Sequence, residues 1–524
     1  MPVSKPKRRA TAKSMAAQQR EISVSEFFTK NRHLLGFDSP TKALLTTIKE
    51  AVDNSLDACE EAGIPPDLVV EIDLAGDNRY RVAVTDNGPG ILKNQIPRIF
   101  GKLLYGSKFH RLRQSRGQQG IGISAAGMYG QLTTGKPIVI ESRTSKRRPA
   151  HRYELVIDTR RNEPVIKKDV LAEWEAPHGT RVEIELEGTY KRGRHGVETY
   201  LHQTALANPH VEIAYRGPGD EEPTLFERAS RELPREAVEI RPHPYGVEVG
   251  LLLRMLKDSK ARRLSSFFRT EFSRVGPTVA ARIVEGADLK TTTSPRRVSP
   301  EAAERLIRSI RDTRIAAPPT DCLSPIGEER VLASLEQQID AEFFATVTRS
   351  PAVYRGNPFQ VEVGLAYGGE LPADELITLY RYANRVPLLY QQGACALYKS
   401  VMTTNWKAYG LTQSRGALPS GPVVLMAHIA SVWVPFTSES KEAVAGYDEI
   451  VRELKLALQQ LGRYLAKHIR HDRKRRDAER KQAYIQKYIP HVGIALQEIL
   501  GLSERQEARV VNTLTETLQR SRKM

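Results

Sequence analysis

Hydrophobic and polar residues between about 25 and 230 alternate between helical and strand patterns. Leu45, Ile48, Val52 and Leu56 recur at the spacing of an amphipathic helix. The runs 69–74 and 79–85 read as two strands joined through Gly76-Asp77-Asn78, and 138–141 reads as another. In 181–186, apolar residues alternate with charged ones, which predicts a strand with one buried and one solvent-facing side. Together these patterns predict a mixed sheet layered on helices.

The pattern changes after residue 240. Three helices are predicted at 247–256, 264–272 and 277–284, and a fourth after Ser299-Pro300-Glu301, a favourable helix start. The segment 316–319, Ala-Ala-Pro-Pro, marks a boundary. Strands return from about 320 to 445, for example at 360–366 and 423–429. The remainder is charged and helical, and Pro490 predicts a break into two helical segments.

Length and composition narrow the class of protein. A chain of 524 residues is too long for one ordinary core, so we expect three or four domains. Lys plus Arg number 79 against 62 Asp plus Glu, a net charge of +17. This excess favours a polyanionic partner such as nucleic acid, although a merely basic soluble protein is the alternative. The three cysteines, Cys59, Cys322 and Cys395, are far apart, which predicts a reducing compartment without disulfides. With no apolar run of spanning length, we expect a cytoplasmic protein that binds no membrane.

Three short segments carry candidate chemistry, the first on the predicted helix. Glu50, Asn54 and Asp57 fall within about 60° of one another on a helical wheel, opposite the apolar stripe. A carboxylate can align and deprotonate an attacking water, and an amide oxygen can bind Mg²⁺. Taken alone, however, such a trio is more often an ordinary solvated helix face.

The second and third segments are rich in glycine. Asp86-Asn87-Gly88-Pro89-Gly90 follows a strand: its carboxylate can accept a hydrogen bond from the adenine amine, and its glycines allow a tight turn. A plain turn is the simpler explanation. Gly117, Gly120 and Gly122 precede a helix-compatible run, so their amides can point at phosphate. No P-loop motif is present, and the strand required before a dinucleotide loop is missing.

The order of these segments resembles the Bergerat ATP-binding fold of gyrase-type ATPases, histidine kinases and mismatch-repair ATPases. His178-Gly179-Thr180, entering a strand, fits a fourth element of that fold. The stretch 105–110 running into 114–120 narrows the choice, because it closely resembles the B-subunit family of DNA topoisomerase VI. The resemblance covers nearly the whole chain.

The resemblance implies a role for each segment. Glu50 would be the general base, Asn54 the Mg²⁺ ligand and Asp86 the residue that reads adenine. Lys441, in the stretch 434–441, would reach the γ-phosphate of ATP as a switch lysine. The other expected nucleotide contacts are Asp57, Gly90, Ser107, Lys108, Gly117, Gln118, Gln119, Gly120, Ile121, Gly122, Ile123, Ser124 and Thr180.

The same resemblance implies an α+β multidomain architecture. We expect a disordered basic arm over 1–20 and a Bergerat-type ATPase domain with an N-terminal strap over 21–235. A helix-two-turn-helix domain would follow over 236–316 and a transducer domain over 317–465. Residues 466–524 would form a helical segment that contacts the A subunit; docking through the apolar positions between Tyr484 and Leu500 is favoured there.

Partners follow from the same resemblance. Double-stranded DNA is expected at Lys191, Arg192 and Arg194 and at Trp406, Lys407 and Tyr409, although the two aromatic residues are equally suited to a core. The basic helical insert and the basic run 470–481 add further cations. We expect an A₂B₂ heterotetramer and an ATP-dependent B–B dimer. The stretch 24–39 is a candidate strap at that dimer contact, or a helix packed on its own domain.

The chain lacks the parts needed to cut DNA. It contains no Asp-x-Asp pair, and none of its 19 tyrosines has a recognisable cleavage context. Cleavage is therefore expected on a separate A subunit. Two rival functions fit the sequence less well. A histidine kinase needs a phospho-acceptor histidine before the ATP site, where only His33 lies; a DNA-binding scaffold with a dead nucleotide site is disfavoured by the intact Glu50, Asn54, glycines and Lys441.

Overall fold

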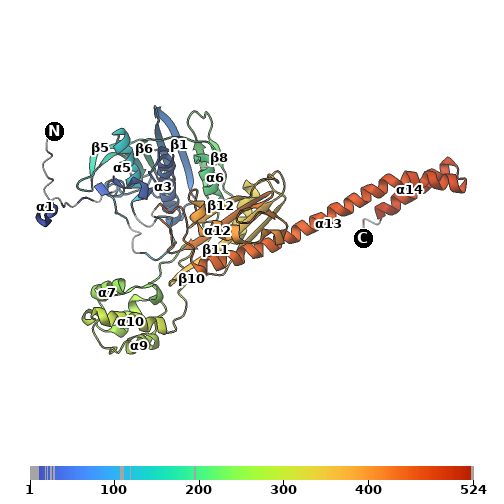
Figure 1. Ribbon diagram of the computed structural model, residues 1–524. Helices are drawn as coiled ribbons and strands as arrows, with labels where there is room; N and C mark the ends of the chain where they lie inside the picture. The colour runs from blue at the N-terminus through green and yellow to red at the C-terminus, as the bar shows by residue number, and fades with distance from the viewer. Residues whose placement is uncertain are drawn as a thin grey trace, which may run out of the picture.

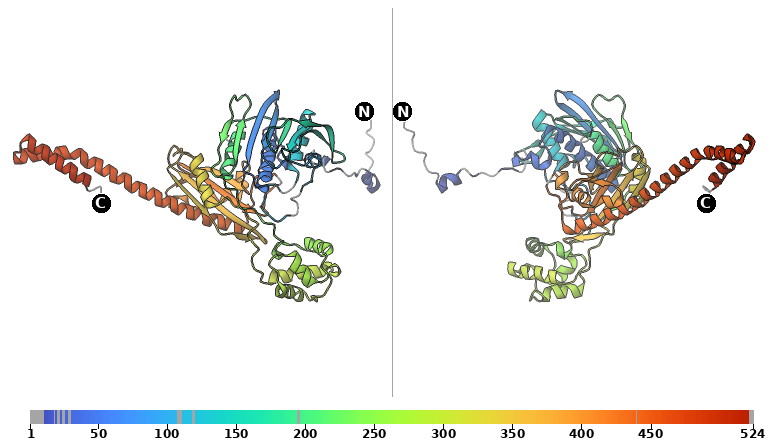
Figure 2. Two further views of the ribbon diagram at one scale, coloured as in Figure 1. Left: turned by 180° about the vertical axis from the view of Figure 1, so that it is seen from behind. Right: turned by 45° about the vertical axis from the view of Figure 1, so that its right-hand side comes forward.

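The computed structural model shows two α/β domains side by side, a separate helical lobe and a long projecting C-terminal helix (Figure 1). It describes residues 11–17, 19, 22–23, 26–27, 30–106, 111–117, 120–193, 196–438 and 440–520. Further views show the helical lobe standing apart from the two domains and the distal part of the long helix projecting away from them (Figure 2). The predicted α+β multidomain class is confirmed.

The first domain is built on an eight-stranded sheet in the order β5-β4-β3-β6-β2-β1-β7-β8. Only the β1–β7 pair is parallel among its ladders. The strands are β1 Asp67–Gly76, β2 Arg79–Asp86, β3 Ile138–Arg143, β4 Ala150–Asp158, β5 Glu163–Ala172, β6 Gly179–Glu187, β7 Glu212–Arg216 and β8 Thr224–Phe226. The four strands predicted in this region are confirmed as β1, β2, β3 and β6.

Helices α3 Pro40–Glu61 and α5 Gly122–Thr134 pack on this sheet, with α4 Ile96–Gly101 and α6 Val197–Ala207 beside them. Ser39 caps α3 by accepting a hydrogen bond from the amide of Lys42 at 3.4 Å, and Pro40 occupies the first turn, where its missing N–H costs nothing. The predicted stripe of α3 is buried: Leu45, Ile48, Val52 and Leu56 are each at most 5% exposed. Burial of this face fixes the direction in which the opposite face of α3 points.

The helical lobe contains the four predicted helices. They are α7 Val249–Asp258, α8 Leu264–Glu271, α9 Pro277–Glu285 and α10 Pro300–Asp312. Phe267, Phe268 and Phe272 pack against one another at the centre of the lobe. Because these rings form a hydrophobic cluster of their own, the lobe is a separate packing unit.

The second domain has a six-stranded sheet in the order β10-β11-β16-β12-β13, with β9 also pairing with β11. Its strands are β9 Phe343–Thr348, β10 Ala352–Tyr354, β11 Asn357–Tyr367, β12 Thr378–Ala383, β13 Val386–Pro387 and β16 Val423–Ser431; β14 Thr412–Gln413 and β15 Pro419–Ser420 form a small separate pair. Helices α11 Glu328–Gln338 and α12 Ala396–Thr403 and the first part of α13 cover the larger sheet. The predicted strands at 360–366 and 423–429 are confirmed as β11 and β16.

Helix α13 runs without a break from Asp448 to Leu500, so the prediction that Pro490 divides it is wrong. A proline inside a helix removes one backbone hydrogen bond, but neighbouring packing can hold the helix together. Helix α14, Glu504–Arg520, folds back against α13 beyond the proline, where Gly493 faces Val511. Helix α13 ends at Leu500, and Gly501 caps it in the left-handed backbone conformation.

The N-terminal region is described only in part. Residues 1–10 of the predicted disordered arm lie outside the described residues, and Ala12–Ala16 within it form a short exposed helix, α1. In the predicted strap, Arg32–Leu35 form a 3₁₀ turn (η1), and the ring of Phe37 stacks on Tyr129 of its own domain at 5.1 Å. Phe28 and the side chain of Leu34 lie outside the described residues, and Phe27 is exposed. Phe37 therefore follows the alternative of packing on its own domain.

Within the described part of the chain, every helix is too short or too polar to cross a lipid bilayer.

Candidate nucleotide site

A cavity of about 580 Å³ lies where the two α/β domains meet. Its walls come from helix α3, the end of β2, the second domain and the glycine segment, a name used here for Gly117 and residues 120–122. The predicted site residues that line it are Glu50, Asn54, Asp86, Gly90, Gly117, Gly120, Ile121, Gly122, Ile123, Thr180 and Lys441. Segments almost 400 residues apart in the chain thus share one cavity.

Glu50 and Asn54 lie one turn apart on the face of α3 that the buried stripe turns toward the cavity. The carboxylate of Glu50 lies directly against Gly122, since a Cβ atom built on Gly122 would be 1.7 Å from Glu50 Oε2. Any side chain at position 122 must therefore displace the carboxylate. Asn54 is exposed, so its amide oxygen is open to a cation.

Asp86 is held in a fixed orientation at the end of β2. Its Oδ1 accepts hydrogen bonds from the amides of Gly88 at 2.9 Å and Thr180 at 3.1 Å, and Oδ2 accepts one from the Ser55 hydroxyl at 2.8 Å. Burial raises the pKa of Asp86, while these three bonds favour the carboxylate. Oδ2 accepts one of these bonds, which leaves it an acceptor position, and Asp86 lines the cavity.

The turn after Asp86 requires glycine at position 90. Gly90 has a φ of +71°, and a Cβ there would be 2.0 Å from the carbonyl oxygen of Arg143. His178, the residue before Gly179, contacts the carbonyl of Gly88 through Nδ1 at 2.7 Å. The turn is therefore connected to the segment that carries Thr180.

The glycine segment leads into helix α5, which begins at Gly122. The first turn of a helix leaves amide donors without intrahelical partners, which suits an anion. Ser124 is an exception among the predicted contacts: it is buried, and its hydroxyl bonds the carbonyl oxygens of Ile99 at 3.0 Å and Lys102 at 3.1 Å. It faces the protein interior rather than the cavity. Ser107, Lys108, Gln118 and Gln119 lie outside the described residues.

Asp57 also departs from the prediction. Its Oδ1 accepts a hydrogen bond from Arg116 Nη1 at 2.8 Å, and the residue is 7% exposed and does not line the cavity. Helical-wheel geometry placed it correctly relative to Glu50, but it could not show that Arg116 covers this end of the helix. Asp57 is thus a structural ion-pair residue in this structure.

Lys441 enters the cavity from the second domain. Its Nζ lies 3.4 Å from the carbonyl oxygen of Arg116, the residue immediately before Gly117. Burial lowers the pKa of Lys441, and the nearby Glu50 carboxylate opposes that shift. The next residue, Glu442, pairs with Lys42 of α3 at 3.1 Å. These contacts bring the lysine and the glycine segment to one wall.

Sequence reasoning missed several cavity residues because no local motif marks them. Leu388, Leu389 and Tyr390 of the second domain line the cavity. Lys42 Nζ lies 4.8 Å from the centre of the Tyr390 ring, a cation–π contact between the domains. This pairing joins residues almost 350 positions apart and becomes visible only in the folded structure.

The predicted DNA-contacting residues lie away from the cavity. Lys407 is exposed, but Trp406 is completely buried and donates its indole N–H to the Val401 carbonyl at 2.8 Å, so direct contact of Trp406 with DNA is contradicted. Tyr409 packs against Gly462 of α13, where a Cβ would be 2.3 Å from its ring. Lys191 and Arg192 are exposed, with Arg192 paired to Asp220 at 3.0 Å, and Arg194 lies outside the described residues.

Comparisons with known proteins match both α/β domains. Residues 40–190 match the family described as histidine kinase-, DNA gyrase B- and HSP90-like ATPases, and residues 318–481 match the topoisomerase VI B-subunit transducer. The B subunit of type 2 DNA topoisomerase 6 from Methanosarcina barkeri is 48% identical over 491 residues, covering 93% of this chain and 79% of that protein. The chain belongs to the topoisomerase VI B-subunit family.

Another member of the family agrees with this assignment. The corresponding protein of Archaeoglobus fulgidus is 47% identical over 498 residues, covering 95% of this chain and 82% of that protein. Among solved structures, the ATPase region of yeast topoisomerase II has a TM-score of 0.42 and 9% identity, covering 87% of this chain and all of that one. That likeness is too distant to bear on function. Family membership makes the protein the ATPase subunit of a type IIB DNA topoisomerase that binds ATP.

Gly122→Ala should reduce ATP hydrolysis, because the added methyl group occupies the position of the Glu50 carboxylate. A displacement of about 1 Å at a reacting group lowers a rate by about a hundredfold. Steady-state ATPase assays would measure the loss. Gly250→Ala in α7 is the matched control, since a Cβ there meets open space. Equal rates for the two variants would contradict this interpretation of the contact.

Asp53, between Glu50 and Asp57 on α3, should make stability depend on pH. Burial raises its pKa to about 7. Because the folded state then keeps a proton that the unfolded state has lost, ionisation destabilises the fold as pH rises from about 4 to about 7, by about 1.4 kcal/mol per pH unit at most. Asp53→Asn should therefore gain stability relative to the parent over that range. Denaturant titrations at pH 5 and pH 8 would show it, and a constant difference between the proteins would refute it.

Proposed function

We propose that ATP binds in the cavity between the two domains, with Glu50 as the general base for its hydrolysis. The observation that supports this most directly is that Glu50, Asn54, Asp86, the glycine segment and Lys441 all line one cavity. The carboxylate that accepts a proton and the amides that suit phosphate thereby face the same space. Ser107, Lys108, Gln118 and Gln119 are proposed to complete the nucleotide contacts.

Asp86 is proposed to recognise adenine. Its orientation is fixed by Gly88, Thr180 and Ser55, so little entropy is lost when a base docks. The remaining acceptor position on Oδ2 suits the exocyclic amine of adenine. Guanine presents an oxygen at the equivalent ring position, and two acceptors facing each other repel. The site therefore favours ATP over GTP.

Mg²⁺ is proposed to bind beside Asn54. The ion takes hard oxygen ligands and often keeps several waters while bridging one or two protein oxygens to phosphates. The exposed Asn54 amide, one turn from Glu50, fits this requirement as a single protein ligand. When bound there, the ion would neutralise phosphate charge.

Lys441 is proposed to sense the terminal phosphate. Its ammonium group lines the cavity and bonds the Arg116 carbonyl oxygen at 3.4 Å, a long contact, so a γ-phosphate would be a stronger partner for it. Hydrolysis and release remove that partner. The preference of the second domain for its docked position then changes with nucleotide state.

DNA, the A subunit and a second copy of this chain are the proposed partners. Exposed cations lie at Lys191 and Arg192, at Lys407 and on the helical lobe, where Lys257, Lys260, Arg262, Arg263, Arg269 and Arg274 are all exposed. The apolar side chains Tyr484, Ile485, Tyr488, Val492, Ile499 and Leu500 are exposed on the distal part of α13, which suits docking of an A subunit. An A₂B₂ assembly with ATP-dependent B–B contact would capture one duplex while the A subunits open another. Its DNA substrate would place it at the nucleoid in the cytoplasm.

Glu50→Gln should bind ATP with nearly unchanged affinity but lose hydrolysis. The amide keeps the size of the side chain but cannot accept the proton of the attacking water, so the rate should fall by about 10² to 10⁴. Fluorescent-nucleotide titration and ATPase assays would separate the two effects. Parent-like turnover would overturn the base assignment, whereas absence of ATP binding by the parent protein would overturn the proposed site.

Lys407→Ala and the double variant Lys191→Ala/Arg192→Ala should weaken DNA binding without changing sequence preference. Each lost phosphate contact should lower the slope of log affinity against log salt by about one. Lys167→Ala is the matched control, because Lys167 is an exposed lysine on β5 outside these patches. Binding titrations of duplexes at several salt concentrations provide the measurement, and slopes equal to the control would count against these contacts.

A further inference from the structure

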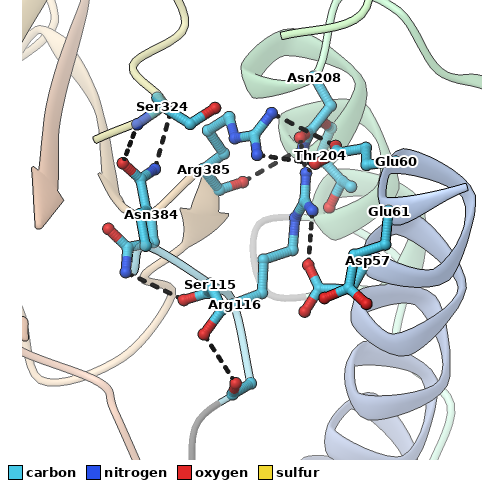
Figure 3. A network of polar contacts seen from close by, with 12 residues as sticks. Asp57, Glu60, Glu61, Ser115, Arg116, Thr204, Asn208, Ser324, Asn384 and Arg385 are labelled. Carbon is cyan, nitrogen blue, oxygen red and sulfur yellow. Dashed lines mark hydrogen bonds and ion pairs between the residues drawn. The ribbon is translucent and has the colours of Figure 1, made fainter. Parts of the chain in front are cut away.

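Glu60, at the C-terminal end of α3, lies in a buried polar cluster where the two domains meet (Figure 3). Its carboxylate accepts hydrogen bonds from three groups. Arg116 Nη2 lies 2.6 Å from Oε1, His210 Nε2 lies 2.8 Å from Oε1, and Arg385 Nη2 lies 2.8 Å from Oε2. Arg116 immediately precedes the glycine segment, whereas Arg385 belongs to the second domain. The Glu60 carboxylate therefore connects the glycine segment to the second domain, the transducer.

The cluster balances its charges. Asp57 and Glu60 supply two negative charges, and Arg116 and Arg385 supply two positive ones, with side-chain exposures of only 1% and 7% for the two arginines. Burial alone would raise the pKa of Glu60, but the two guanidinium groups hold it well below its usual range. Removing either arginine charge would leave a buried charge without compensation, which is costly.

The transducer forms further hydrogen bonds to residues 115 and 116, which precede the glycine segment. Asn384 Nδ2 donates to the Ser115 carbonyl at 3.0 Å, and Lys441 Nζ lies 3.4 Å from the Arg116 carbonyl. Asn208 of the first domain bonds the Arg116 side chain and donates to the Arg385 carbonyl at 3.2 Å. The transducer thus holds residues 115 and 116 through their backbone carbonyls. The Arg116 side chain is held by Glu60 and Asn208 of the first domain, which also bond Arg385.

The turn that carries Arg385 has an unusual backbone. Asn384 and Arg385, between β12 and β13, have φ values of 49° and 67°. A left-handed conformation is unfavourable for arginine and persists where surrounding contacts determine it. The amide of Arg385 donates to His428 Nε2 at 3.0 Å, and His428 Nδ1 lies 2.8 Å from Glu362 Oε2. His428 and Glu362 are opposite residues in β16 and β11, so the turn is anchored in the transducer core.

We propose that Arg385 is a positioning residue that couples the glycine segment to the transducer through Glu60 and Arg116. The Arg385–Glu60 ion pair fixes the position of the transducer relative to residues 115–117, so that Lys441 and the glycine segment contact the same phosphate group. This proposal rests on the proposed ATP site. It adds that the glycine segment and Lys441 act together because the buried Arg385–Glu60 ion pair, which lies outside the cavity, connects the first domain to the transducer.

Arg385→Met tests the proposal, since methionine fills a similar space without the charge. We expect ATP affinity to stay within about threefold of the parent, while the number of ATP molecules consumed per supercoil removed rises about tenfold in the complete enzyme with its A subunit. Arg385→Lys should restore part of the coupling. Arg349→Met is the matched control, because it removes the Arg349–Glu453 pair, with Nη2–Oε2 at 3.0 Å, within the transducer.

A second variant covers the case in which Arg385→Met fails to fold. Asn384→Gly keeps the left-handed turn and leaves no buried charge unpaired. It removes the bond to Ser115 together with two bonds to the Ser431 backbone within the transducer, so it should also raise ATP consumption per supercoil. Coupling equal to Arg349→Met in Arg385→Met, or in Asn384→Gly where Arg385→Met does not fold, would overturn the positioning role. If the parent enzyme itself showed no ATP-dependent relaxation, the proposed function would fail instead.

Discussion

Burial of ionised side chains between the domains is the constraint on which the site depends. A carboxylate such as Glu60 is tolerated away from water only when cations and hydrogen bonds compensate it, and Arg116 and Arg385 provide both. Their directional bonds admit few relative positions of the two domains. Apolar packing alone would allow them to slide, whereas a buried guanidinium–carboxylate pair loses its compensation when displaced. The cavity that both domains line inherits this fixed geometry.

Within the cavity, the position of the Glu50 carboxylate is set by its close contact with Gly122. The Glu50 carboxylate occupies the space that a side chain at Gly122 would fill, so the acid lies against the start of α5. Helix starts favour negative charge through their free amides and their dipole. The same helix end that suits a phosphate therefore also faces the group proposed to activate water.

Much of this arrangement was predictable from local patterns. The stripe of α3 predicted which face carries Glu50 and Asn54, and turn composition predicted the tight turn that contains Gly90. Pairings distant in sequence were not predictable. Nothing near Asp57 indicates that Arg116 covers it, and nothing near Ser124 indicates that its hydroxyl points toward Ile99. Trp406 shows the same limit. An aromatic residue beside a lysine suits both a DNA-contacting loop and a hydrophobic core, and its packing within the second domain decides between the two roles. Pro490 failed as a helix stop because α14 supports α13 beyond it.

Only a few residues separate Lys441 from the start of the long C-terminal helix α13. Ala443 and Val444 are buried in the transducer core, and α13 begins at Asp448 with Ile450, Leu454, Leu458, Leu461 and Leu465 packed in the same core. The lysine and the first five turns of the helix thus belong to one packed unit. At 1.5 Å per residue, the 53 residues of α13 span about 80 Å. A rotation of a few degrees at the proposed nucleotide site would displace the distal apolar surface by several ångströms. Such a rotation would connect a small change at the proposed phosphate position to the proposed docking surface.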